Sequence, residues 1–244
     1  MFESMNWDSL CEDFSAGYQQ GAALSSAHPP PAIAAEHAQN PADEDIRWLV
    51  KALKDDRRKW FVAHVMKSAL PLSGVFFIPL LDAGIDETNP SFNKLFIWPC
   101  TGVFGRKRVN EYLLEVIESG TDFRKAGAVN ALYWAQMPVS YSAEFLCFDS
   151  VEETREAEKA LAGLWERKRK LLLETFVANP NVDVRRSIIP SLRLDPTVYP
   201  AHLQPLVPQA IAIARSSSDE YIRHRVEVQL GTAKLFAPLP HRKK

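Results

Sequence analysis

Apolar residues recur at helical spacing along most of the chain. From Asp43 onwards they return every three or four positions, and short polar turns separate runs of about three to four helical turns. No stretch shows the apolar–polar alternation, bounded by hairpin turns, that marks a β-strand. Residues 138–150, "PVSYSAEFLCFDS", interrupt the helical pattern, and we expect an irregular insertion there. The pattern therefore predicts an all-α fold.

The first 42 residues differ from the rest in pattern and in charge. Residues 19–42, "QQGAALSSAHPPPAIAAEHAQNPA", are rich in Ala, Ser, Gln and Pro and predict a flexible linker. Of the 30 acidic residues five lie before position 43, where there is no Lys or Arg, so the rest holds 25 acidic against 29 basic residues. The sequence thus predicts two parts, an acidic N-terminal arm with its linker at 1–42 and a helical domain at 43–244.

The start of the arm combines acidic residues with apolar anchors. The anchors are Phe2, Met5, Trp7, Leu10 and Phe14. Because the body of the chain is mildly basic, this segment can return to it over a linker of about 24 residues. We expect the arm either to dock on its own protein or a neighbouring copy, or to remain a loose tail.

Four segments of the chain align on one pattern, in which a polar turn is followed by Arg, a second polar residue and a mostly apolar helix. They are "DRRKWFVAHVM", "DFRKAGAVNAL", "DVRRSIIPSL" and "YIRHRVEVQLG". The aligned arginines are Arg58, Arg124, Arg185 and Arg223. The last two are 38 positions apart, and the longer earlier gaps fit one repeat plus a diverged one.

This pattern resembles the HEAT-repeat family of α-solenoids. "NVDVRRSIIPSL" and "SDEYIRHRVEVQLG" match best, and Phe123 takes the place of Val in "GTDFRKAGAVNAL". The resemblance implies an α-solenoid of about five helical hairpins of about 40 residues each. It also implies that each aligned Arg is a structural turn residue, paired with an acid such as Asp122 or Asp183. An arginine in this place can also reach carbonyls at the end of the preceding helix.

The register of these helices separates a core face from a face that can bind a partner. Positions three and seven after each Arg are mostly apolar and are expected in the core, among them Phe61, Val65, Ile188, Leu192, Val226 and Leu230. Positions two and six form a second strip, expected to be exposed on the concave side. The partner-binding candidates on it, with Trp134 as an extension, are Trp60, His64, Asn130, Trp134, Ser187, Arg225 and Gln229. The alternative for this strip is a solvated face with no ligand.

Composition and motifs narrow the function classes. The net charge of −1 argues against bulk nucleic acid as a partner, and three distant cysteines without a CxxC pair favour a reducing, cytoplasmic setting. The first residues do not resemble a signal peptide, and no apolar run is long enough to cross a bilayer. Nucleotide-binding, zinc-protease and nucleophile-elbow motifs are absent, so the sequence predicts no catalytic residue, metal site or cofactor.

The chain is therefore expected to be a non-catalytic scaffold that binds a protein or peptide, although an enzyme is not excluded. The alternative is a HEAT-like DNA-binding protein or DNA glycosylase, because six tryptophans accompany a mildly basic body. No residue of such an active site can be assigned. Trp48, Trp98 and Trp165 are expected in the core, and the basic run at 166–170, "ERKRK", on the solvated face of a long helix.

Overall fold

Helices make up nearly all of the regular structure in the described part of the chain. The computed structural model describes residues 5–19, 32–137, 139–141, 146–148 and 159–232. These residues form an all-helical fold with helix-on-helix packing and one short pair of strands, so the predicted all-α class is confirmed. The chain divides into two compact units. Unit 1 comprises residues 1–113 and 130–160, and unit 2 comprises residues 114–129 and 161–244.

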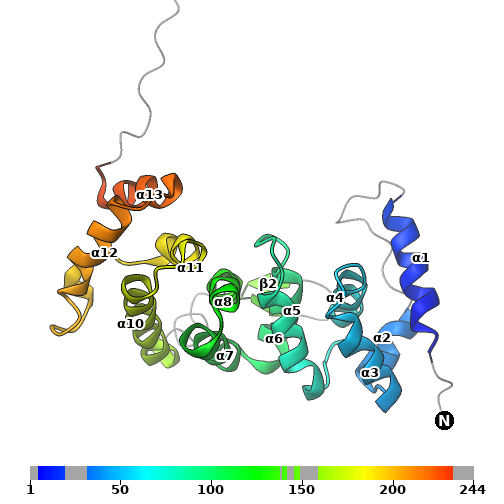
Figure 1. Cartoon of the computed structure of the whole chain (residues 1–244). Coiled ribbons are helices and arrows are strands. Elements are labelled where there is room, and N and C mark those ends of the chain that lie inside the picture. The colour runs from blue at the N-terminus through cyan, green and yellow to red at the C-terminus, as the bar shows by residue number, and fades with distance from the viewer. Residues whose placement is uncertain (1–4, 20–31, 138, 142–145, 149–158, 233–244) are drawn as a thin grey trace, which may run out of the picture. The chain divides into compact units, whose positions relative to one another are not determined.

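Unit 1 contains the N-terminal helices and the helices that pack on them. These are α1 (Trp7–Gln19), α2 (Ala32–Gln39), α3 (Asp43–Ala52), α4 (Lys59–Ser68), the 3-10 turn η1 (Gly74–Phe76), α5 (Phe77–Ile85) and α6 (Lys94–Phe104). Helix α4 contacts α1, α2 and α3 on one side and α6 on the other, and α6 packs along α5 (Figure 1). The core of unit 1 is aromatic and aliphatic, because Phe61, Phe76, Phe96 and Leu80 are all fully buried.

The predicted insertion at 138–150 contains a short pair of antiparallel strands. Strand β1 (Val139–Tyr141) pairs with β2 (Leu146–Phe148) in the register Val139 to Phe148. The expectation of a wholly irregular insertion is therefore corrected for these six residues. The sequence missed the pairing because three-residue strands are too short to show an alternation.

Unit 2 consists of two helical hairpins in sequence. Its elements are α10 (Ala162–Ala178), α11 (Val182–Ile188), the 3-10 turns η2 (Ile189–Ser191) and η3 (Pro196–Val198), α12 (Leu206–Arg215) and α13 (Glu220–Leu230). Helix α10 packs on α11 and α12 on α13, while α10 also packs on α12 and α11 on α13. The first helices of the two hairpins thus lie next to each other, and so do the second helices.

The ends of the unit 2 helices are fixed by residues suited to capping. The side chain of Asn181 accepts hydrogen bonds from the backbone N–H groups of Asp183 and Val184 at the start of α11. Asp219 accepts from Ile222 N at the start of α13. Gly231 ends α13 with φ 71°, a left-handed conformation that favours glycine. The turns that the sequence places before Arg185 and Arg223 therefore have a local cause.

Two further helices belong partly to each unit. Helix α7 (Arg106–Ser119) crosses the division after Leu113, and α8 (Asp122–Ala135) crosses it after Val129. The C-terminal turns of α7 and the N-terminal turns of α8 belong to unit 2.

The predicted core register is largely confirmed. Phe61, Val65, Ile188 and Val226 have no exposed surface and Leu192 is 3% exposed, whereas Leu230, near the end of α13, is half-buried. Phe123 departs from the pattern, because the equivalent Val184 and Ile222 are buried while Phe123 is 59% exposed.

The N-terminal segment is a docked helix over the residues that the structure describes. Trp7 and Cys11 of α1 are buried, and the ring of Trp7 stacks on Trp48 with a centroid distance of 5.8 Å. Of the two alternatives for the start of the arm, docking is confirmed for α1 and a loose tail is wrong, because an apolar face of the helix covers α3 and α4. Helix α2 likewise lies inside the range expected to be a linker, with Ala34 and Ala38 fully buried. Of the other expected anchors, Met5, Leu10 and Phe14 are half-buried, and Phe2 lies outside the described residues.

Candidate functional site

Unit 1 carries a cluster of aromatic side chains that reaches the surface. The rings of Trp98 and Trp134 meet edge to face at 5.3 Å, and Tyr133 meets Trp134 at 4.9 Å. Tyr133 is 62% exposed, while both tryptophans are half-buried. The indole Nε1 of Trp134 donates a hydrogen bond of 2.8 Å to the carbonyl oxygen of Pro90. We call Lys94, Trp98, Tyr133 and Trp134 the aromatic group.

Lys94 places a cation on the aromatic group. Its Nζ lies 5.6 Å from the ring centre of Trp98 and 5.5 Å from that of Trp134, which is within cation–π range. The ammonium therefore sits against the two indoles and leaves Tyr133 as the most exposed ring of the group. The sequence expectation that Trp98 lies in the core is corrected, because its ring is half-buried beside Trp134.

Trp60 and His64 lie on the same helix, α4, but neither is freely exposed as expected. Trp60 is half-buried and meets Phe92 edge to face at 4.7 Å. The ring of His64 lies 5.1 Å from that of Phe14 of α1, and its Nδ1 is 2.8 Å from the carbonyl oxygen of Trp60. Burial is the main cause that lowers the pKa of His64 below its usual range. The docked α1 helix thus covers part of the predicted partner strip.

Asn130 and Trp134 belong to unit 1, whereas Ser187, Arg225 and Gln229 belong to unit 2. Asn130 and Ser187 are half-buried. Arg225 is half-buried as well, and its Nε is buried without a hydrogen-bond partner among the described residues. The structure therefore brings Trp60, His64, Asn130 and Trp134 into one unit, and their role in partner binding stays a prediction.

Gln229 has a structural role that its place in the helix register does not reveal. Its side-chain amide donates to the carbonyl oxygens of Ile189 at 2.8 Å and Pro190 at 3.3 Å. These carbonyls belong to η2, about 40 residues earlier, so the side chain ties α13 to the end of the preceding hairpin. The expectation that Gln229 is exposed is therefore corrected, because it is half-buried against η2.

Two of the aligned arginines bind the end of the preceding helix. Arg185 Nε donates to the carbonyl oxygen of Phe176 at 3.1 Å, in the last turns of α10. Arg223 donates to the carbonyl oxygen of Ser217, just after α12, at 2.6 Å. Both contacts are those of a structural turn residue near a helix C-terminus. Arg124 is half-buried at the start of α8.

Arg58 has a different set of neighbours. It is exposed and forms an ion pair of 3.0 Å with Asp8 of α1, and its guanidinium lies 5.7 Å from the ring centre of Trp48. This arginine therefore helps to hold the N-terminal helix.

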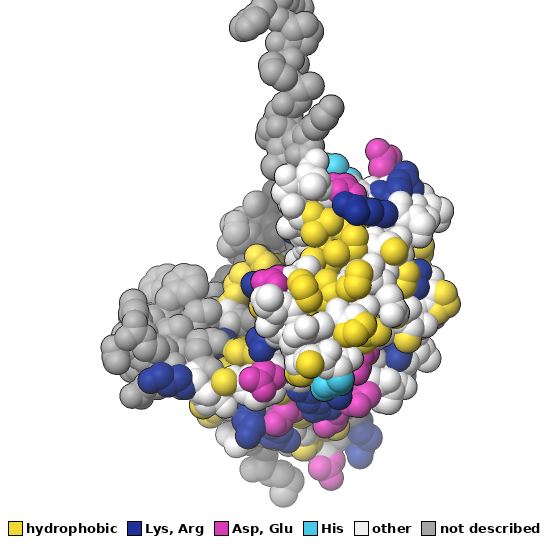
Figure 2. Space-filling view, turned by 90° about the vertical axis from the view of Figure 1, so that its left-hand side faces the viewer, with side chains coloured by type: hydrophobic (Ala, Val, Ile, Leu, Met, Phe, Trp, Pro, Cys, Tyr) yellow, Lys and Arg dark blue, Asp and Glu magenta, His cyan; other side chains and the backbone are white. Residues whose placement is uncertain are grey.

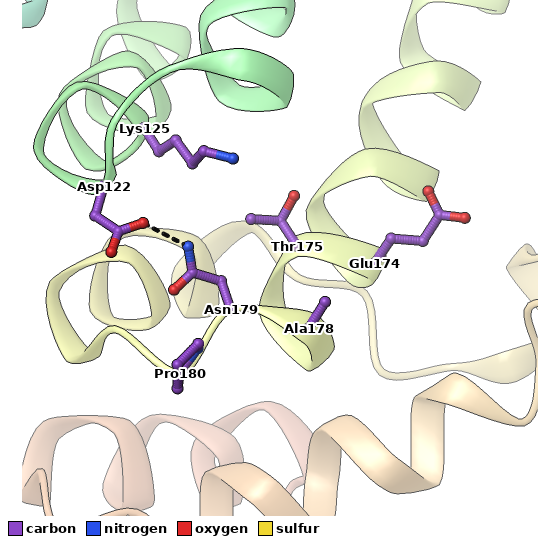
Figure 3. Close-up of a pocket in the computed structure, with 7 residues that line it drawn as sticks. All are labelled: Asp122, Lys125, Glu174, Thr175, Ala178, Asn179 and Pro180. Carbon is purple, nitrogen blue, oxygen red and sulfur yellow. Dashed lines mark hydrogen bonds between the residues drawn. The ribbon is translucent and has the colours of Figure 1, made fainter.

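A surface depression of unit 2 lies between the start of α8 and the end of α10. It is lined by Asp122, Lys125, Glu174, Thr175, Ala178, Asn179 and Pro180 (Figure 3). Asn179 Nδ2 donates to Asp122 Oδ1 at 2.7 Å, which closes the side of the depression nearest the two turns (Figure 3). Lys125 Nζ donates to the carbonyl oxygen of Glu118. Asp122 and Asn179 thus bind each other across neighbouring turns, while Lys125 binds the backbone at the end of α7.

The exposed side of α12 is uncharged up to its last residue, Arg215, and is mostly apolar, with Gln209 as an exposed polar side chain. Residues 203–214 contain no charged side chain, and Pro205, Pro208 and Ala212 are exposed. Figure 2 shows hydrophobic side chains gathered in the middle of this side of the molecule, with charged side chains along the lower edge.

Among the described residues no group of three or more His, Cys, Asp and Glu side chains is placed to hold a metal ion, and no helix there is long and apolar enough to cross a membrane. No protein-family model, curated protein or solved structure matches the chain.

The sequence did not single out Tyr133 and Lys94. The available signal was the run "ALYWA" in α8, where two adjacent aromatics cannot both face the core of one helix.

Proposed function

We propose that the chain is a non-catalytic protein-interaction module, a HEAT-like α-solenoid that works as a scaffold in the cytoplasm. It holds a segment of a partner protein against the aromatic group of unit 1. The mechanism is preorganised display, in which a stiff helical framework holds the binding side chains in place and so lowers the ordering cost of association.

The packing of unit 2 supports the HEAT-like part of this proposal. The first helices of its two hairpins pack on each other, and so do the second helices. The aligned Arg185 and Arg223 each donate to a backbone carbonyl near the end of the helix before them. The turns are also linked from one hairpin to the next, since Arg186 forms an ion pair of 3.2 Å with Asp219, the cap of α13. Such nearest-neighbour contacts are what a helical-repeat array requires.

The aromatic group is the single observation that carries the binding role. Aromatic rings supply large contact area at small entropic cost, and tyrosine and tryptophan are enriched at the energetic centres of protein interfaces. Tyr133 is exposed beside two half-buried indoles, with a lysine across them. A partner that covers Tyr133 would bury its ring and desolvate the cation–π contacts, and both changes favour binding.

The test is recovery of a partner by the tagged protein from its native host, with and without nuclease. Tyr133→Ser removes the exposed ring, and Lys94→Met removes the cation. Ile78→Ser is the matched control, because Ile78 is a 52% exposed apolar residue of the same unit outside the aromatic group. We expect the wild-type protein and Ile78→Ser to recover the same protein after nuclease treatment, and both aromatic-group variants to lose most of it.

Loss of the recovered protein on nuclease treatment would contradict the proposal and favour the DNA-binding alternative. Unchanged recovery by Tyr133→Ser and Lys94→Met, with the fold intact by circular dichroism, would also contradict it.

A further inference from the structure

A groove in unit 2 lies between helix α10 and the segment that leads into α12. It has a volume of about 360 Å³ and is more enclosed than a surface depression, with walls of opposite character. One wall is the face of α10 that carries Glu166, Arg167, Arg169 and Lys170, and the other wall is apolar. The run "ERKRK", expected on a solvated helix face, thus lines a groove, because η3 and the residues after it fold back along α10.

Two of the three cationic side chains on this wall are paired with a carboxylate, and the third is paired with none in the described part of the chain. Arg167 NH2 lies 2.9 Å from Glu118 Oε2, and Lys170 Nζ lies 4.0 Å from Glu174 Oε1. Arg169 forms no ion pair within the described residues, although it lines the groove. Its charge also contributes, after burial, to lowering the pKa of the adjacent Lys168 to about 8. A guanidinium in such a place is suited to a carboxylate or another planar anion.

The opposite wall exposes apolar surface at its rim. Tyr199 and Leu203 are 4% and 3% exposed, and the half-buried Val198 and exposed Pro200 form the rim. The hydroxyl of Tyr199 already donates a hydrogen bond of 2.9 Å to the carbonyl oxygen of Arg193. This wall can bury an aliphatic side chain but gives it no polar partner.

We propose that this groove binds an acidic peptide segment of a partner protein. One carboxylate of the peptide lies on Arg169, and a neighbouring aliphatic side chain lies against Val198 and Pro200. The inference rests on the proposed function as a protein-binding module, and it assigns that module a second contact of defined chemistry.

A peptide suits the groove better than a nucleic acid does. Glu166 stands on the cationic wall and would repel phosphates, whereas a peptide can place a neutral residue beside it. Single-stranded nucleic acid is held by stacking on open aromatic faces, and the ring of Tyr199 is almost completely buried. The volume of the groove holds a few side chains, with the charge on one side of the peptide and the apolar residue on the other.

The experiment uses fluorescence anisotropy with the full chain and a labelled peptide, Glu-Asp-Leu-Leu-Glu-Asp. Its amide analogue, Gln-Asn-Leu-Leu-Gln-Asn, and a labelled oligo-dT are the comparison ligands. Arg169→Gln removes the free guanidinium. Gly163→Leu fills the groove without a charge change, since a Cβ on Gly163 meets nothing within 4 Å. Arg47→Gln, an exposed arginine of unit 1, is the control for net charge.

We expect the acidic peptide to bind more tightly than its amide analogue, and both Arg169→Gln and Gly163→Leu to weaken it by about tenfold. Arg47→Gln is expected to leave the affinity unchanged. The inference is overturned if the acidic peptide does not bind at about 1 mM, or binds equally well to both groove variants. Tighter binding of oligo-dT that is lost in Arg169→Gln overturns it in favour of a nucleic-acid site.

The result of the peptide-binding experiment can be told apart from the result of the partner-recovery experiment that tests the proposed function. Loss of peptide binding in the groove variants leaves the Tyr133-dependent partner recovery as an independent measurement on unit 1. If the recovery fails while the groove binds the peptide, the aromatic group has been misassigned and the groove has not.

Discussion

The indole Nε1 of Trp7 donates a hydrogen bond to Asp45 Oδ1 over 2.6 Å, across 38 residues of sequence. Both side chains are buried, and the other carboxylate oxygen of Asp45 accepts from the backbone N–H of Ala42 at 3.2 Å. The carboxylate thus joins the start of α3 to the N-terminal helix. The docking of α1 therefore depends on a polar contact as well as on its apolar face.

Replacing Trp7 by Phe should destabilise the protein. The variant keeps an aromatic ring against Trp48 but leaves Asp45 Oδ1 buried without its donor, which costs about 1–3 kcal/mol of unfolding free energy. Urea unfolding measures this, with Ser9→Ala as a control, because Ser9 is exposed on the same helix. A change no larger than that of the control would mean that α1 contributes little to the stability of unit 1.

Leu192→Ala should lower the free energy of unfolding by about 2–5 kcal/mol. The side chain is 3% exposed after η2, so its removal leaves a cavity in unit 2. Ser191→Ala, at the exposed neighbouring position, is the control and should stay within about 0.5 kcal/mol of wild type. Equal effects in chemical denaturation would show that the burial of this turn is misassigned.

Gln229→Ala should cost about 1–2 kcal/mol, because the carbonyls of Ile189 and Pro190 lose a shared donor. Gln209→Ala removes the same side chain from an exposed site on α12 and should have little effect. If thermal unfolding does not distinguish the two variants, the contact between α13 and η2 does not contribute to stability.

The helical fold and most of the core could be predicted from the sequence, because the buried face of a helix appears as apolar residues every three or four positions. Phe61, Ile188 and Val226 were found in this way. Periodicity reports that a face is covered, but not which segment covers it. It therefore missed that Phe14 lies on His64 and that Gln229 reaches η2.

The groove was missed for a related reason. Arg169 and Tyr199 are 30 positions apart and come together only because the chain folds back along α10. A charged run has the same appearance in the sequence whether water or another segment faces it. Tyr133 was missed because the predicted partner strip contained only the positions two and six residues after each aligned arginine, with Trp134 as an extension.

Lys168→Met should stabilise the protein near neutral pH by about 1–3 kcal/mol. Burial, and then the charge of Arg169, lowers the pKa of Lys168 from 10.5 to about 8 in the folded protein. At pH below about 8 the lysine is charged in both states, and the folded state bears the cost of holding that charge. The methionine avoids this cost and keeps the aliphatic stem.

The advantage of Lys168→Met should shrink with rising pH. From about pH 8 to about 10.5 the unfolded chain binds the proton more often than the folded chain, so wild type gains stability relative to the variant. Urea unfolding of both proteins from about pH 7 to about pH 10 measures the difference, with Lys170→Met as the control for net charge. A difference that is constant across this range would contradict the lowered pKa.

The division of α7 and α8 between the two units has a consequence for the order in which the protein forms. The chain starts unit 1, supplies residues 114–129 to unit 2, returns to unit 1 for residues 130–160 and then enters unit 2 again. On the ribosome, part of unit 2 therefore emerges before unit 1 is complete, and no single cut in the gene separates the two. The units are interleaved in synthesis, so neither can be obtained as a contiguous fragment.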